Sequence, residues 1–270
     1  AVILSTGCMS PGRSKTEKET ITLKDTDLIS IEASSADIEV ISEDREDISV
    51  VLNTYERGPK LKVSGGKTVH IAAESQRGIH VGVTFSYSPR MTIYVPKEYN
   101  KSIEVDNSSG DLVMKELNLD GLQIDLSSGD IRVTKVTFKE GDIDSSSGDI
   151  TLKEVVCDQI KIDSSSGDLR LEDFTGAIEG SSSSGDVLIT YKEYSGDIDY
   201  STQSGDITVD FNNQQVDADF DLDCNSGDID INFDLDEINK DKKNYISGTN
   251  GEGIYQIRIH ASSGDITVKK

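Results

Sequence analysis

The sequence predicts an all-β protein, a single-chain parallel β-helix (β-solenoid) with coils of about 19 residues. Three observations lead to this fold class. The tripeptide Ser-Gly-Asp recurs at nearly constant spacing, short runs with alternating apolar residues flank it, and no long segment has the periodicity of a helix. One such repeat cannot bury its apolar face alone, so successive repeats are expected to stack.

The Ser-Gly-Asp repeat is the strongest feature of the chain. Its glycines are Gly110, Gly129, Gly148, Gly167, Gly185, Gly205, Gly227 and Gly264, with steps of 19, 19, 19, 18, 20, 22 and 37 residues. Stacking in register, at about 4.8 Å per strand, predicts two apolar columns. One contains Ile131, Ile150, Leu169, Val187 and Ile207, and the other contains Ile143, Ile162, Ile178 and Ile198. Right-handed coiling is the default for parallel crossovers, and an antiparallel hairpin array is the alternative architecture.

Each residue of the tripeptide suits a sharp corner. Glycine takes a positive φ without strain, and the flanking Ser and Asp side chains can bind backbone N–H groups that a corner leaves unpaired. A second, weaker corner is expected at Gly141, Gly176 and Gly196, so that each coil has at least two corners.

The chain divides into three parts. Residues 1–20 are expected to be a truncated signal or anchor remnant and a flexible tether, with Cys8 as a candidate lipidation site and a transmembrane anchor as the alternative. Residues 21–105 are expected to form irregular β rungs or an N-terminal β cap, because only Ser34 to Val40 resembles the repeat, with Ala36 in place of glycine. Residues 106–270 form the predicted solenoid, with an exposed loop at 236–253.

The composition limits the possible partners. The 27 Lys and Arg against 50 Asp and Glu give a net charge of −23, which argues against nucleic acid and direct binding to anionic lipid. The three cysteines are too few and too widely spaced for a disulfide framework or a metal site, and Cys157 and Cys224 are expected to be buried free thiols.

One stretch resembles a known family. Thr92-Ile93-Tyr94-Val95-Pro96-Lys97, then Ser102 to Val105, then Asn107-Ser108-Ser109-Gly110-Asp111, is similar to the bacterial putative-adhesin family that includes LiaG-like envelope proteins, as is the closing segment Ala261 to Val268. The resemblance implies a surface-exposed β-helical domain behind a membrane or lipid anchor. It brings no catalytic residues and no cofactor.

The repeated aspartates should form a ladder along one edge. They are Asp111, Asp130, Asp149, Asp168, Asp186, Asp206 and Asp228. Like charges about 5 Å apart repel, so each carboxylate requires local donors or a cation. Structural capping of the turns is the first interpretation and weak calcium binding the second, with no other metal or cofactor expected.

An enzyme is the least favoured alternative. Polysaccharide-active enzymes use β-helices, but the pairs Asp142/Asp144 and Asp228/Asp230 are what outward alternation produces in any acidic strand. There is no Trp to stack on a sugar, and His70, His80 and His260 are scattered. We therefore expect a non-catalytic extracytoplasmic module, an adhesin or envelope scaffold that binds an envelope polymer or protein. Tyr191, Tyr194 and Tyr200 are candidate exposed contact residues, and a core role for some of them is the equal alternative.

Overall fold

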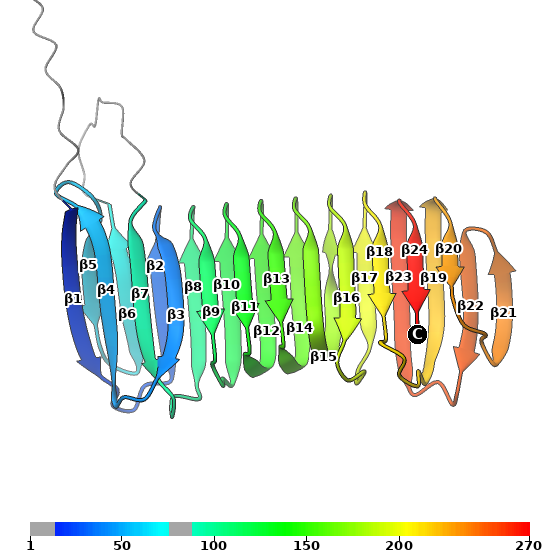
Figure 1. The fold of residues 1–270 in the computed structure, drawn as a ribbon, viewed down its shortest axis with the longest axis horizontal. Helices are drawn as coiled ribbons and strands as arrows, with labels where there is room; N and C mark the ends of the chain where they lie inside the picture. The colour runs from blue at the N-terminus through cyan, green and yellow to red at the C-terminus, as the bar shows by residue number, and fades with distance from the viewer. Residues whose placement is uncertain (1–13, 76–87) are drawn as a thin grey trace, which may run out of the picture.

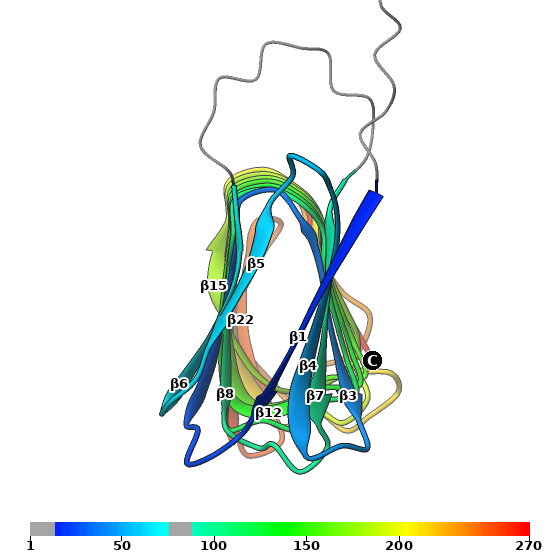
Figure 2. The same ribbon diagram turned by 90° about the vertical axis from the view of Figure 1, so that its left-hand side faces the viewer.

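A computed structural model describes residues 14–75 and 88–270, and every regular element in these ranges is a β-strand. The all-β prediction is confirmed. The strands form a long rod with two walls, sheet A and sheet B, that face each other across a narrow core (Figures 1 and 2). Across the same ranges, no helix has the length and apolar character needed to span a membrane.

The two sheets have the following strands, in spatial order along the rod. Sheet A contains β1 (Ser14–Thr22), β4 (Asp47–Tyr55), β7 (Arg90–Pro96), β3 (Asp37–Glu43), β9 (Leu112–Lys115), β11 (Ile131–Thr134), β13 (Ile150–Lys153), the first part of β15 (Leu169–Ser182), β16 (Val187–Tyr191), β18 (Ile207–Asp210), β24 (Ile266–Lys269) and β20 (Ile229–Ile231). Sheet B contains β5 (Lys60–Ser64), β6 (Thr68–Glu74), β2 (Leu28–Ala33), β8 (Ser102–Asn107), β10 (Gly121–Leu126), β12 (Thr137–Ser145), β14 (Val156–Ser164), the second part of β15, β17 (Ile198–Thr202), β23 (Tyr255–Ser263), β19 (Ala218–Ser226), β22 (Tyr245–Asn250) and β21 (Glu237–Lys242).

One rung consists of a sheet B strand, the Ser-Gly-Asp corner, a sheet A strand and a second corner. Successive rungs pair in parallel, and the column from Ile131 to Ile207 has the predicted register. The other predicted column is wrong beyond Ile162, which pairs with Gly180, whereas Ile160 pairs with Ile178. The pairing of β14 with β15 contains a register irregularity between Val156 and Gln159. The step of 18 residues from Gly167 to Gly185 signals the missing residue, but not its position within the rung.

The second corner does not lie at the predicted glycines. Gly141 and Gly176 lie within β12 and β15, and Gly196 lies in the connection before β17. The second corner instead has non-glycine residues with positive φ of 52–56°, at Glu116, Lys135, Glu154 and Asp173, again 19 residues apart. Gly141 has a packing role, since a Cβ there would lie 2.6 Å from the ring of Phe138.

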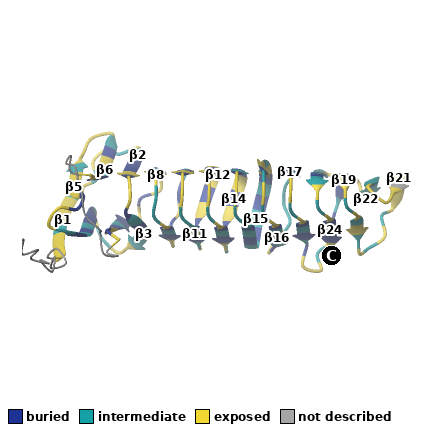
Figure 3. Ribbon diagram, turned by 90° about the horizontal axis from the view of Figure 1, so that it is seen from above, coloured by how far each residue is buried: buried dark blue, intermediate teal, exposed yellow. Residues whose placement is uncertain are grey.

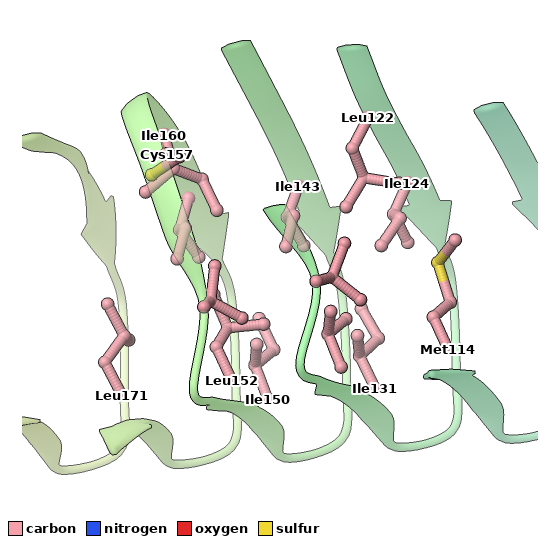
Figure 4. Packing of buried hydrophobic residues seen from close by; sticks show 14 of the residues in the cluster. Met114, Leu122, Ile124, Ile131, Ile143, Ile150, Leu152, Cys157, Ile160 and Leu171 are labelled. Carbon is pink, nitrogen blue, oxygen red and sulfur yellow. The ribbon is translucent and has the colours of Figure 1, made fainter. Parts of the chain in front are cut away.

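Strand alternation produces the core. Inward residues of both sheets are buried while their neighbours are exposed, so buried and exposed residues alternate along the strands (Figure 3). Leu, Ile and Met side chains from the two walls meet in the middle (Figure 4). Each fully buried aliphatic side chain contributes about 1.5–3 kcal/mol relative to an exposed one.

Spatial order departs from chain order near both ends of the rod. The β2/β3 rung lies between the β6/β7 and β8/β9 rungs, and the β23/β24 rung lies between the β17/β18 and β19/β20 rungs. The long final step of 37 residues therefore does not mark a simple succession of rungs. Residues 236–253 were expected to be an exposed loop, but they contain the antiparallel hairpin β21/β22, which extends sheet B beyond β19.

The N-terminal region is also more regular than expected. Strand β1 starts at Ser14 and pairs antiparallel with β4, so residues 14–20 are not a tether. The β2/β3 rung pairs in the same parallel register as the repeats that follow it. Residues 1–13, with the lipidation candidate Cys8, and residues 76–87, with His80, lie outside the described residues.

Candidate functional site

The Ser-Gly-Asp aspartates form a continuous hydrogen-bonded ladder along one edge of the rod. In each step, an aspartate Oδ1 accepts the backbone N–H of the aspartate on the next rung, at 2.8–3.3 Å. The order is Asp37, Asp111, Asp130, Asp149, Asp168, Asp186, Asp206, Asp265 and Asp228. Asp37 and Asp265 are additional members, and Asp265 precedes Asp228 because its rung is intercalated. One oxygen of each carboxylate from Asp37 to Asp265 thus caps a turn.

The second carboxylate oxygen of several ladder residues pairs with a cation from the chain. Arg132 Nη2 lies 2.7 Å from Asp130 and its Nη1 lies 3.8 Å from Asp111, while Arg170 Nη2 lies 2.8 Å from Asp168. These contacts meet the need for donors that the stacked charges create. Cation binding to this ladder stays a prediction.

The corner glycines are required by close stacking. A Cβ on Gly148 would lie 2.0 Å from the carbonyl oxygen of Gly129, and the φ of Gly148 is 116°. The other inner corner glycines have the same contact with the preceding rung, at 2.1–2.3 Å. Ala36 occupies the corner position of the β2/β3 rung and is buried. On the neighbouring β6/β7 rung, the residue that precedes β7 is Pro89 and not glycine, and the N–H of Asp37 donates to its carbonyl.

A second line of carboxylates, which the sequence analysis did not identify, runs across the outer face of sheet B. We call it the acidic row, and it consists of Glu32, Asp106, Asp125, Asp144 and Asp163 on five adjacent strands. Its signal in the sequence is an aspartate four residues before the corner glycine. Among the described residues, Asp106 and Asp125 have no ion-pair partner, so these like charges are left uncompensated, in contrast to the ladder.

In a nearby row, formed by Lys101, Asp120 and Lys139, positive and negative side chains alternate. Asp120, at the second corner, accepts Lys101 Nζ at 3.3 Å and Lys139 Nζ at 2.7 Å from the rungs on either side. Hydrogen bonds from Lys139 and Lys101 lower the pKa of Asp120. Because signs alternate here but not along the acidic row, repeat geometry does not by itself force like charges to line up.

The acidic row affects the titration of its own members. Burial, together with the charges of Asp142 and Asp163, raises the pKa of Asp144. Burial alone would also raise the pKa of Asp163, but hydrogen bonds from Lys161 at 2.6 Å and Ser181 at 2.7 Å lower it overall. The face therefore holds one carboxylate with a raised pKa beside another with a lowered pKa.

A shallow depression lies on the same face, beside the acidic row. We call it the trough; its volume is about 540 Å³. Its lining residues come from β2, β8, β10, β12 and β14: Leu28, Ser102, Ile103, Glu104, Gly121, Leu122, Gln123, Glu140, Gly141, Asp142, Gln159 and Lys161. Ser102 and Gly121 pair with each other and are smaller than the outward side chains around them, which leaves the space.

The trough is lined mainly by polar groups that both donate and accept hydrogen bonds. Gln123 and Gln159 can do both, Glu104, Glu140 and Asp142 accept, and Lys161 donates. A polymer rich in hydroxyl or amide groups matches such a surface, and an anionic polymer does not, since the net charge of the lining is negative.

The family can now be assigned. The family model of Toastrack DUF4097 matches residues 26–269, nearly the whole chain. The chain belongs to the Toastrack DUF4097 family. The comparison with curated protein sequences finds no significant match for this Toastrack chain.

The comparison with solved structures finds similar chains at low sequence identity. A crystal structure described as a "putative adhesin" from Bacteroides fragilis has a TM-score of 0.59 and 13% identity, covering 96% of this chain and 99% of that one. A "putative lipid binding protein" and a "putative adhesin", both from Parabacteroides distasonis, have TM-scores of 0.47 and 0.44 and identities of 16% and 14%. They cover 96% and 95% of this chain and 98% of each of their own.

The tyrosines predicted as exposed contacts are core residues of this toastrack. Tyr191 and Tyr200 are buried, and Tyr194 is half-buried in an aromatic cluster with Tyr191, Phe211 and Tyr255. Of the two alternatives, the structure therefore supports the core role and not the exposed contact.

The histidines and cysteines within residues 14–75 and 88–270 do not converge. His70 is exposed on β6, whereas His260 lies on β23 with its Nδ1 3.3 Å from Asp223, and the described residues contain no cluster able to hold a metal ion. The predicted free, buried thiols are confirmed for Cys157 and Cys224, and burial raises the pKa of Cys157 to about 12. The pairs Asp142/Asp144 and Asp228/Asp230 are exposed, as outward alternation predicts.

Proposed function

We propose that this toastrack protein is a non-catalytic binding module displayed outside the cytoplasm, an adhesin or envelope scaffold that contacts a cell-envelope polymer through the outer face of sheet B. The trough supports this proposal most directly, because hydrogen-bonding side chains from the four strands β8, β10, β12 and β14 line one continuous surface. The adhesin names of similar structures and the family resemblance support surface display, and anchoring through Cys8 or a preceding membrane segment belongs to the same proposal.

The test is binding to purified, protein-free cell-wall glycan, measured by co-sedimentation. Gln123→Ala with Gln159→Ala removes two amide groups from the trough without changing the charge, and we expect affinity to fall roughly tenfold or more. Thr151→Ala with Thr208→Ala makes a matched neutral change on the outer face of sheet A and should leave binding intact. Equal binding of the glycan by both variants would mean that the contact lies outside the trough. Binding to an envelope protein fraction, and not to the glycan, would mean that the partner is a protein.

The same assay separates binding from catalysis. Glu104, Glu140 and Asp142 share the trough, which is the arrangement that a glycan-active enzyme would require. We expect no new reducing ends when the protein is incubated with the glycan. Their appearance, and their loss in Glu140→Gln, would reassign the trough as a catalytic cleft.

Cation dependence is the second candidate function, and the uncompensated acidic row favours it over the capped ladder. Millimolar calcium should raise the thermal midpoint more than magnesium does if the carboxylates hold the ion. Asp125→Asn with Asp144→Asn should abolish this rise, whereas Asp130→Asn with Asp149→Asn should not. If calcium and magnesium raise the thermal midpoint equally, the effect is general screening of the negative charges and not binding of an ion.

A further inference from the structure

The two ends of the rod differ in how far each sheet extends. Beyond the β23/β24 rung, sheet A has one more strand, β20, while sheet B has three, β19, β22 and β21. Beyond the β2/β3 rung at the other end, sheet A has three strands, β7, β4 and β1, while sheet B has two, β6 and β5. One end therefore has a longer sheet B and the other a longer sheet A (Figure 1).

The overhang at the β21 end leaves apolar surface uncovered. Ile238 lies opposite Gly248, which in turn lies opposite the buried Phe220, so it is on the core side of sheet B. Its exposed fraction is nevertheless 59%, because sheet A has no strand facing it. Ile229, Ile231, Phe233 and Leu235 are also only partly buried here, and β21 is bonded along one edge only within the part of the chain that the structure describes.

The opposite end is closed by strands and carries the opposite charge. Strand β1 crosses it (Figure 2), and Glu17 accepts the N–H of Leu61 on β5 at 2.7 Å. Residues 56–67 contain four Lys or Arg and one Glu, a net charge of +3. Residues 228–243 contain six Asp or Glu and three Lys, a net charge of −3.

We propose that a second copy of this chain docks head to tail, with its β1/β5 end against the β21 end. Lys60, and Lys62, which also pairs with Glu74 of its own chain, then face Asp236 and Glu237, and the partner's longer sheet A covers Ile238. This contact is heterologous, so it repeats along a filament. Pairing of β21 with itself across a two-fold axis centred on Lys240 is disfavoured, because it places the two Lys240 side chains opposite each other.

The test is sedimentation velocity of the full chain against protein and salt concentration. The mean mass should rise with protein concentration and fall with added salt, because the contact depends on exposed charges. Lys60→Glu with Lys62→Glu should weaken association about tenfold or more, as should Asp236→Lys with Glu237→Lys. Lys135→Glu with Lys192→Glu makes the same charge change away from both ends and is the matched control.

Mixing the two reversed variants provides the decisive measurement. Each variant alone has like-charged ends, but the mixture restores opposite charges at every contact, so association should return to near the unmodified level. A chain that stays monomeric up to millimolar concentration would overturn the proposal. So would association that the end variants do not weaken, or that mixing does not restore. Ile238→Lys should also weaken association, with circular dichroism confirming that the half-exposed site tolerates the change.

Discussion

At the scale of single residues, each rung depends on two corners with opposite requirements. The Ser-Gly-Asp corner has room only for hydrogen at its centre, because the backbone of the neighbouring rung lies within van der Waals contact. The second corner has space for a side chain but holds it in a left-handed conformation. Substitutions at the two corners should therefore have opposite effects on stability.

Gly148→Ala should be strongly destabilising, by about 3 kcal/mol or more, because a Cβ 2.0 Å from the Gly129 carbonyl oxygen forces the rungs apart and φ is unfavourable. Chemical unfolding measures the loss. Ser147→Ala, at the neighbouring exposed position, should change the free energy of unfolding by less than about 0.5 kcal/mol. A small effect of Gly148→Ala would mean that the rungs separate easily.

Glu154→Gly should stabilise the protein by about 0.5–1 kcal/mol, because glycine removes the strain of a φ of 52°. Glu179→Gly changes the same residue types within strand β15 and should instead destabilise by a similar amount. Thermal unfolding of both variants tests the pair. Equal losses in the two variants would contradict a strained corner at Glu154.

At the scale of elements, the sequence predicts the strands and the Ser-Gly-Asp corner of a rung well, but it predicts poorly where that rung lies along the rod. Strand alternation around the tripeptide, as in Ile131 and Val133, predicts which side chains are buried. The second corner was missed because Glu116 or Lys135 has no glycine signal for positive φ. The place of β23/β24 along the rod was missed because every rung has the same Ser-Gly-Asp corner. A rung made later can therefore stack between two earlier rungs as well as it can stack at the end of the rod.

Hydrogen exchange should follow spatial order rather than chain order. Amides of β24, bonded on both sides by β18 and β20, should exchange as slowly as those of β18. Amides of β21, the outermost strand of sheet B, should exchange among the fastest strand amides. Peptide-resolved mass spectrometry measures both. Fast exchange in β24 would mean that the intercalated rung opens on its own.

At the scale of the whole molecule, stacking converts a local pattern into long rows of charge. The ladder aspartates were predicted from the tripeptide, and most of their donors are backbone groups that stacking supplies. The acidic row and the trough were missed, since both depend on which outward residues of neighbouring rungs become adjacent. The sequence could not decide between an exposed and a core position for Tyr191, Tyr194 and Tyr200, because the width of the core at a rung depends on how the rungs stack.

Repulsion along the acidic row should be measurable as stability. Asp144→Asn should raise the free energy of unfolding by about 0.5 kcal/mol at neutral pH and low salt. The folded-state pKa of Asp144 is raised first by burial and then by the charges of Asp142 and Asp163, so the penalty develops as pH rises from the ordinary pKa of Asp through the raised value. The gain should thus vanish in acid, where both forms are neutral, and shrink in high salt. A gain that persists in acid would point to packing instead of charge.

The intercalated rung has a consequence for biosynthesis. A ribosome makes the β17/β18 rung and then the β19/β20 rung, but the β23/β24 rung that joins them follows only after residues 211–254 have been made. Until then the growing chain carries four unpaired strand edges, on β17, β18, β19 and β20. A nascent chain released before residue 255 would keep those edges open for proteases and chaperones, so completion of the rod reports that translation has passed this point.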